Sequence, residues 1–95
     1  MIETTIANAG EYEGQDVTIK GWLYNKRSSG KIHFLIVRDG TGIMQGVMLK
    51  KEVPEEQFNM FEELTQESSI IVSGTVRKDD RAPGGYELTI KNLEP

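Results

Sequence analysis

Basic and aromatic side chains are interleaved over a short stretch between residues 20 and 38. The basic members are Lys20, Lys26, Arg27, Lys31 and Arg38, and the others are Trp22, Tyr24, His33 and Phe34. Cations of this kind neutralise phosphates, and aromatic rings stack on the bases of single-stranded nucleic acid. A single lysine is typical of the solvated side of a strand, so the stretch allows both a plain surface and a nucleic-acid interface.

No comparable set of residues in the sequence indicates catalytic chemistry. His33 is the only histidine and the chain has no cysteine, which excludes thiolate metal sites and disulfides. The glycines at 30 and at 84–85 match no phosphate-binding loop in length or in lysine placement. Asp39 and the pair at 79–80 fall in expected turns, where aspartate is favoured by the backbone. We therefore expect no catalytic and no metal-binding residues, and a binding module by elimination.

The net charge of −4 argues at first against a nucleic-acid partner, but its distribution reverses that reading. Six glutamates and no basic residue lie between positions 52 and 67: Glu52, Glu55, Glu56, Glu62, Glu63 and Glu67. Outside this acidic segment, 11 basic residues stand against nine acidic ones. The remainder of the chain is therefore mildly basic.

The elements that must position these side chains follow from hydrophobic periodicity. Strands are predicted at 17–27, 32–37, 43–49, 70–77 and 86–91, and an amphipathic helix at 54–66, after a lead-in segment at 1–14. Five antiparallel strands with one helix between the third and the fourth predict an all-β fold, the five-stranded OB-fold Greek-key barrel. All 95 residues then form a single domain.

Two further features fit such a barrel. Gly21 and Gly46 lie inside predicted strands, where a glycine marks a bulge or a bend. On the predicted helix, Phe58, Phe61 and Leu64 recur on one face, so they should plug one end of the barrel. The glutamates of the helix would then face solvent, away from the basic strands.

The second and third strands carry the residues best suited to hold a base. An OB barrel commonly binds single strands across these two strands, and here they contain Phe34 and Gln45. Gln45 should face outward or find a partner, because an unpaired buried amide costs about 1–3 kcal/mol. Phe34 lies within the apolar run 32–37, so periodicity alone also allows it to be a core residue. If both face outward, they form a stacking platform beside an amide.

The segments Gly21–Arg27, Lys31–Gln45, Gly74–Arg77 and Arg81–Leu88 together resemble the N-terminal anticodon-binding domain of class IIb aminoacyl-tRNA synthetases, most closely the asparaginyl member. The resemblance covers the chain from about Val17 onward. It implies that Phe34 stacks on the central uridine of the anticodon, and that Gln45 hydrogen-bonds the edge of this base. It further implies that Glu87 lies near the first base, a guanine, and that Arg27 contacts the anticodon nucleotides or their backbone.

The same resemblance implies that ATP and Mg²⁺ act in a separate catalytic domain, so no cofactor is expected in this one. The chain is then a domain of an asparagine–tRNA ligase or a free-standing relative. We expect a homodimeric parent, a monomeric fragment and a cytoplasmic location, with the tRNA anticodon loop as partner and no membrane. The alternatives are an aspartyl- or lysyl-type domain, a generic single-strand-binding OB protein, or a protein-interaction domain that uses its acidic helix.

Overall fold

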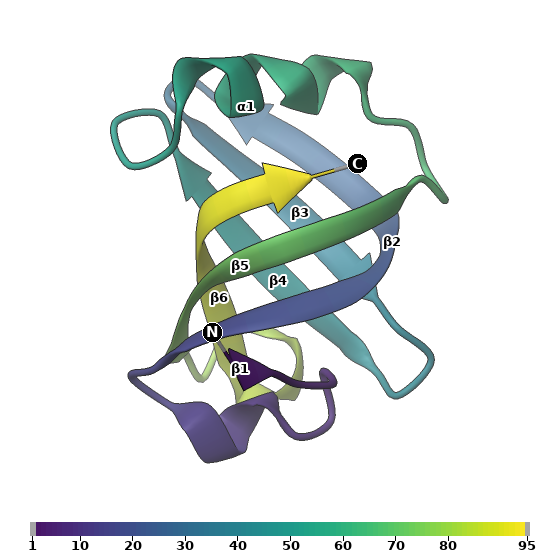
Figure 1. Cartoon of the computed structure of the whole chain (residues 1–95), viewed down its shortest axis with the longest axis vertical. Helices are drawn as coiled ribbons and strands as arrows, with labels where there is room; N and C mark the ends of the chain where they lie inside the picture. Colours follow the sequence, from purple (N-terminus) through teal and green to yellow (C-terminus); the bar gives the residue numbers. More distant parts are fainter. Residues whose placement is uncertain (1, 95) are drawn as a thin grey trace.

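The computed structural model describes residues 2–94 and shows a closed barrel (Figure 1). Its strands are β2 (Asp16–Ser29), β3 (Ile32–Arg38), β4 (Ile43–Leu49), β5 (Ser69–Lys78) and β6 (Tyr86–Glu94). They pair in the order β2-β3-β4-β6-β5, and β5 pairs back to β2. The helix α1 (Glu55–Met60) lies between β4 and β5. The predicted five-stranded OB-fold is confirmed.

One pairing corrects the expectation of five antiparallel strands. Strands β4 and β6 run parallel, with Gln45 opposite Glu87 and Val47 opposite Thr89. The reason is the chain path: β4 is followed by a crossover through α1, and the β5–β6 pair then returns the chain beside β4 in the same direction. This parallel contact joins the β2-β3-β4 part of the sheet to the β5–β6 pair.

Strand β2 pairs with two neighbours, β5 and β3, and so closes the barrel. It pairs with β5 from Asp16 to Trp22 and with β3 from Trp22 to Ser29. Gly21 lies at this change of partner, where a Cβ would collide with the carbonyl oxygen of Arg38. Gly21 therefore lies where β2 changes partner, and the register shift of a bulge comes later, at Tyr24.

Gly46 has a different role from the one predicted. No register shift occurs there; instead, a Cβ on Gly46 would lie 2.6 Å from Cδ1 of Ile90, which fills the barrel interior. The residue is a glycine because a core side chain occupies the space beside it.

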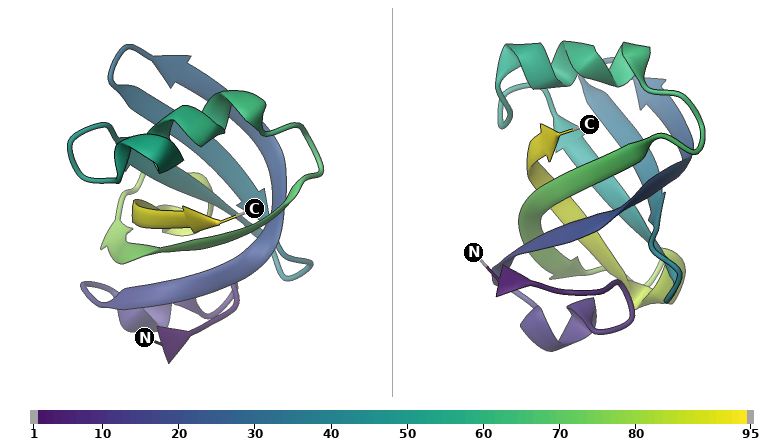
Figure 2. Two further views of the ribbon diagram at one scale, coloured as in Figure 1. Left: turned by 45° about the horizontal axis from the view of Figure 1, so that its top comes forward. Right: turned by 45° about the vertical axis from the view of Figure 1, so that its right-hand side comes forward.

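Helix α1 lies across one open end of the barrel (Figure 2). It is shorter than the predicted 54–66: the chain continues as the 3₁₀ turn η2 (Phe61–Glu63) and becomes extended at Leu64. Phe58, Phe61 and Leu64 are all buried, as predicted for a plug. The six glutamates of the acidic segment are exposed.

The acidic segment is not, however, remote from the basic strands. Lys26 on β2 reaches the end of the helix, where its Nζ donates a hydrogen bond to the carbonyl oxygen of Phe61 at 2.8 Å. The ammonium also lies 5.0 Å from the centre of the Phe61 ring. A cation at this point complements the negative end of the helical turn. Lys26 therefore helps to hold the helix and its buried rings, the plug, over this end of the barrel.

His33 on β3 completes this end of the core. Its ring is stacked between those of Phe58 and Phe61, with both centroids 3.9 Å away, and its Nδ1 lies 2.9 Å from Oγ of Ser28. Only 4% of the residue is exposed. Burial lowers the pKa of the imidazole, although the charge of Glu62 partly opposes this effect. A neutral His33 is thus part of the plug, as expected for a structural histidine.

The lead-in at 1–14 is more ordered than a plain connection. It contains the short strand β1 (Ile2–Glu3), which pairs in parallel with β2, and the 3₁₀ turn η1 (Ala9–Tyr12) at the end of the barrel opposite α1 (Figure 1). Asp39 holds it there, since its carboxylate accepts hydrogen bonds from the backbone N–H groups of Ile6 and Thr41, both at 2.8 Å.

Within residues 2–94, no helix is long and apolar enough to span a membrane.

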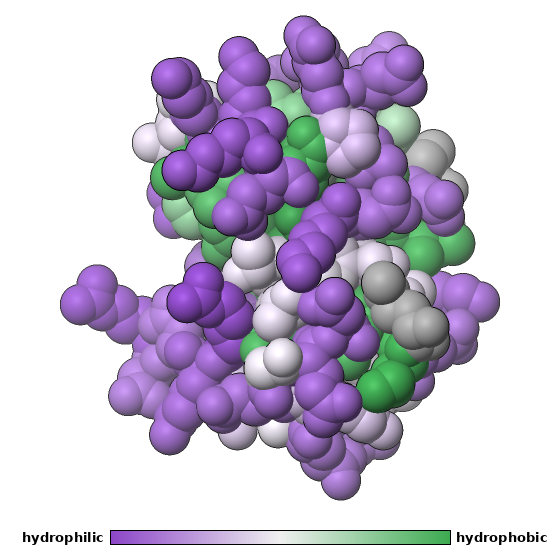
Figure 3. Space-filling view, turned by 60° about the vertical axis from the view of Figure 1, so that its left-hand side comes forward, coloured by the Kyte–Doolittle hydropathy of each residue, from purple (hydrophilic) through white to green (hydrophobic). Residues whose placement is uncertain are grey.

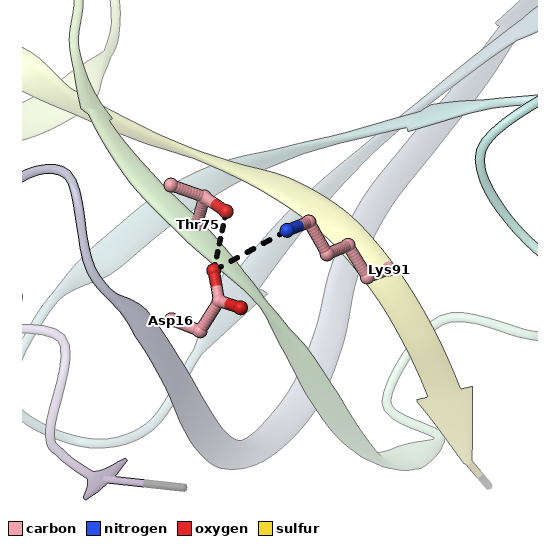
Figure 4. A network of polar contacts seen from close by, with 3 residues as sticks. All are labelled: Asp16, Thr75 and Lys91. Carbon is pink, nitrogen blue, oxygen red and sulfur yellow. Dashed lines mark hydrogen bonds and ion pairs between the residues drawn. The ribbon is translucent and has the colours of Figure 1, made fainter.

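A polar network joins three strands on the barrel wall (Figure 4). Asp16 at the start of β2 accepts a 2.5 Å hydrogen bond from Thr75 on β5 and lies 3.5 Å from Nζ of Lys91 on β6. The hydrogen bond from the Thr75 hydroxyl is the main cause that lowers the pKa of this carboxyl; burial opposes it, and Lys91 lowers the pKa further. Lys91 therefore has an acidic partner within the fold.

Replacing Phe61 tests the plug. Phe61→Ala should destabilise the domain by about 3–5 kcal/mol, because it removes a buried ring and one side of the His33 stack. Glu63→Ala, two residues away and exposed, should change stability by no more than about 0.5 kcal/mol. Denaturant unfolding of both variants measures the difference. An unchanged midpoint for Phe61→Ala would contradict the packing described.

Acidification tests the buried histidine. Because the folded pKa of His33 lies below 6.5 and the unfolded ring keeps its ordinary value, the unfolded state binds more protons at acidic pH. The stabilising effect of the neutral ring is complete above pH of about 6.5 and is lost as pH falls below it. Thermal melts between pH 8 and pH 5 should show a steeper loss for the native chain than for His33→Gln. Parallel curves would refute this assignment.

Candidate nucleic-acid interface

Phe34 faces outward from β3. Along this strand His33, Leu35 and Val37 are buried, whereas Ile32, Phe34 and Ile36 are only partly buried. Side chains alternate between the two faces of a strand, so the three buried residues define the core side. The alternative that Phe34 belongs to the core is therefore wrong. An apolar run this continuous hides the alternation, because both faces of β3 carry apolar residues.

Arg27 lies directly beside this ring. It is the partner of Phe34 in the β2–β3 register, and its Cζ is 4.2 Å from the ring centre. At this distance the guanidinium is attracted by the electrons of the aromatic face. Arg27 is itself exposed. The pair thus presents a planar cation and an aromatic ring together on the outer surface.

Gln45 and Glu87 meet across the parallel pair. They are opposite each other in the register of β4 and β6, and Nε2 of Gln45 lies 3.5 Å from Oε2 of Glu87. Both are partly buried. Burial and the neighbouring Asp79 raise the pKa of Glu87. The amide of Gln45 and the charge of Arg77 partly offset this increase. The contact is long for a hydrogen bond, so either group can turn to a ligand.

All four predicted site residues therefore lie on one continuous face. Val47 follows Phe34 and Arg27 in one row across the sheet, and Ile36 precedes Gln45 and Glu87 in the next row. Directly opposed residues of neighbouring strands are about 4.5–5.5 Å apart. The face offers a ring, an amide, a carboxylate and a guanidinium within reach of a few adjacent nucleotides.

The other members of the interleaved stretch separate in the fold. Arg38 lies over Trp22 and Tyr24, with its Cζ 5.3 and 5.7 Å from their ring centres, and so adds a second cation–aromatic group that was not among the predicted site residues. Its signal was the same interleaving that marked Phe34. Lys20 instead pairs with Glu3 at 3.3 Å. Within the described part of the chain, no three His, Cys, Asp or Glu residues are grouped to hold a metal ion.

A closed barrel of this strand order, with aromatic, amide and charged side chains across β2, β3, β4 and β6, defines an OB-fold protein of the nucleic-acid-binding class. Comparison with known families agrees. Residues 17–95 match the tRNA anti-codon family, described as an OB-fold nucleic acid binding domain. The chain belongs to this family.

Its most similar relatives point to one member. The chain is 57% identical to the asparagine–tRNA ligase of Pelotomaculum thermopropionicum and 59% identical to that of Desulforamulus reducens, over 99% of its length and 22% of theirs in each case. The crystal structure of asparaginyl-tRNA synthetase from Pyrococcus horikoshii superposes with a TM-score of 0.90 at 43% identity, covering 99% of this chain and 23% of that one. The asparaginyl resemblance predicted from the sequence is confirmed for the domain. The chain spans about a fifth of the length of these relatives.

Proposed function

We propose that this chain binds the anticodon loop of a tRNA as the anticodon-recognition domain of an asparagine–tRNA ligase. The observation that carries the proposal is the outward position of Phe34 under Arg27, one row from the Gln45–Glu87 pair. The high identity to asparagine–tRNA ligases favours the asparaginyl type over the aspartyl alternative. A putative aspartyl-tRNA synthetase from Leishmania major is only 23% identical and supports the fold alone.

In this proposal, the central uridine of the anticodon stacks on Phe34. An aromatic platform of this kind is worth about 1–3 kcal/mol per base. The amide of Gln45 offers both a donor and an acceptor, which suits the edge of uridine with its imino N–H and its carbonyl oxygens. Since Gln45 lies on the strand next to Phe34, it can reach the edge of a base that stacks on the ring.

Glu87 then faces the first anticodon base, a guanine. The amino and imino groups of guanine are both donors, and an ionised carboxylate can accept from the two together. Arg27 lies at the other end of the face, on β2, where its guanidinium contacts the anticodon nucleotides or their backbone.

The remaining parts of the proposal concern the parent protein. Amino-acid activation, with ATP and Mg²⁺, would occur in the part of the ligase that lies outside this domain. We place the parent in the cytoplasm as a homodimer, and we expect the isolated domain to be monomeric because the family interface lies largely in the catalytic domain.

Phe34→Ala tests the stacking platform. The fold should lose less than about 1 kcal/mol, as is usual for a residue outside the core. Binding of an anticodon stem-loop RNA should weaken by about 1–3 kcal/mol, which is about 5- to 150-fold. Thermal melts measure the first effect, and fluorescence anisotropy titrations with stem-loop RNA measure the second.

Two matched variants make this test specific. Phe34→Tyr keeps the aromatic face and should retain most of the affinity, whereas Phe34→Leu keeps only apolar bulk and should not. A stem-loop with a scrambled anticodon should bind the native chain weakly. If Phe34→Leu binds as well as the native chain, or if Phe34→Ala unfolds the domain, the stacking role is wrong.

Glu87→Gln tests the reading of guanine. The fold should remain intact, and the preference for guanine over adenine at the first anticodon position should fall, because an amide offers one acceptor and a mismatched donor. In the native chain the same preference should fade on acidification, beginning above the ordinary carboxyl pKa of 4.5, since the pKa of Glu87 is raised. Competition between two stem-loops at several pH values measures both effects. Equal preference in mutant and native chain would remove Glu87 from the site.

A further inference from the structure

A groove of about 820 Å³ opens at the α1 end of β3 and β4, outside the four residues of the proposed reading site. Its floor includes Ile32 and Leu49, which are opposite each other in the β3–β4 register. Both continue the outward face of the site, since Ile32 is two residues before Phe34 and Leu49 is two residues after Val47. The groove is therefore an extension of the same surface.

Three lysines line this groove. Lys31, Lys50 and Lys51 are all exposed, and the backbone N–H of Lys50 donates to the carbonyl oxygen of Lys31 at 3.0 Å, which holds two of them side by side. Among residues 2–94, none of the three takes part in an ion pair, in contrast to Lys20 and Lys91. Glu55 is the one carboxylate in the lining. The groove thus carries an excess of uncompensated positive charge.

The floor of the groove is apolar. Ile32 and Leu49 are partly buried, and Val53 in the connection to α1 is 8% exposed. Figure 3, which brings the left-hand side of Figure 1 forward, shows apolar surface in its upper half with hydrophilic side chains around it. Cations beside an apolar floor suit a ligand that has a phosphate at one end and a flat, weakly polar group at the other.

We propose that this groove binds one nucleotide that flanks the anticodon triplet, with its phosphate between Lys31 and Lys50 and its base or ribose on Ile32 and Leu49. The inference rests on the proposed function. Ile32 and Phe34 are two positions apart on β3, a distance of about 7 Å, and stacked nucleotides follow each other every ~3.4 Å. A loop stacked on Phe34 therefore reaches the groove within about two nucleotide steps. Lysine binds such a phosphate as a point charge.

The salt dependence of RNA binding tests the groove. For the native chain, the logarithm of the affinity for an anticodon stem-loop should fall with the logarithm of salt concentration with a slope of about −2 to −3, because each phosphate contact in a single strand contributes about −0.7. The double variant Lys31→Gln/Lys50→Gln should lower the magnitude of this slope by about 0.7, because it removes the one phosphate contact that the two lysines share. The control Lys20→Gln/Lys91→Gln removes the same charge from two lysines that are already paired with acids, and it should leave the slope unchanged.

The outcomes separate the groove from the reading site. Phe34→Ala should weaken binding at every salt concentration without changing the slope, so its result bears on the proposed function alone. An unchanged slope in Lys31→Gln/Lys50→Gln would overturn the groove, and so would an equal change in the control. Sedimentation of the native chain tests whether the groove instead binds the acidic segment of a second copy of the chain, since that would produce a dimer. A dimer that the lysine variant dissociates, together with an unchanged slope, would also overturn the proposal.

Discussion

Strand β2 pairs with β5 along its first half and with β3 along its second half, and this double pairing closes the barrel. The change of partner requires the backbone of β2 to pass very close to the carbonyl of Arg38, which only a residue without a Cβ permits. Gly21 meets that requirement. Because β3 and β4 are held in place through this closure, the outer face that carries the candidate site depends on it as well.

The bulge at Tyr24 determines that Lys26 points to the helix end of the barrel and that Arg27 points to the outer face. After the register shift, Lys26 is opposite the buried Leu35 and Arg27 is opposite Phe34. Adjacent residues of a strand point to opposite sides, so a shift by one residue would exchange their places. Lys26 turns to the end of the helix at Phe61, and Arg27 turns to the aromatic ring outside. Of these two neighbouring cations, Lys26 thus stabilises the plug and Arg27 becomes part of the candidate interface.

Strand β3 links the same two regions. His33 is clamped between the rings of the plug, and the next residue, Phe34, faces outward beside Arg27. The packing that holds one therefore fixes the backbone that presents the other. In the proposed function, the stacking platform is positioned before the RNA arrives, which limits the conformational entropy lost on binding. The plug is thus a support for the interface.

Local patterns in the sequence were enough for the five strands, their order and the buried face of the helix, because alternation and helical spacing record which side of an element is apolar. They could not place Phe34, since both faces of β3 are apolar, and they missed the parallel β4–β6 pair, which depends on the path of the whole chain. The sequence marked Arg27 only as one of the cations in the interleaved stretch, and Glu87 became a candidate only through the family resemblance. Their positions beside Phe34 and Gln45 were decided by the tertiary structure, because a bulge and a closing strand bring together side chains that no local spacing connects.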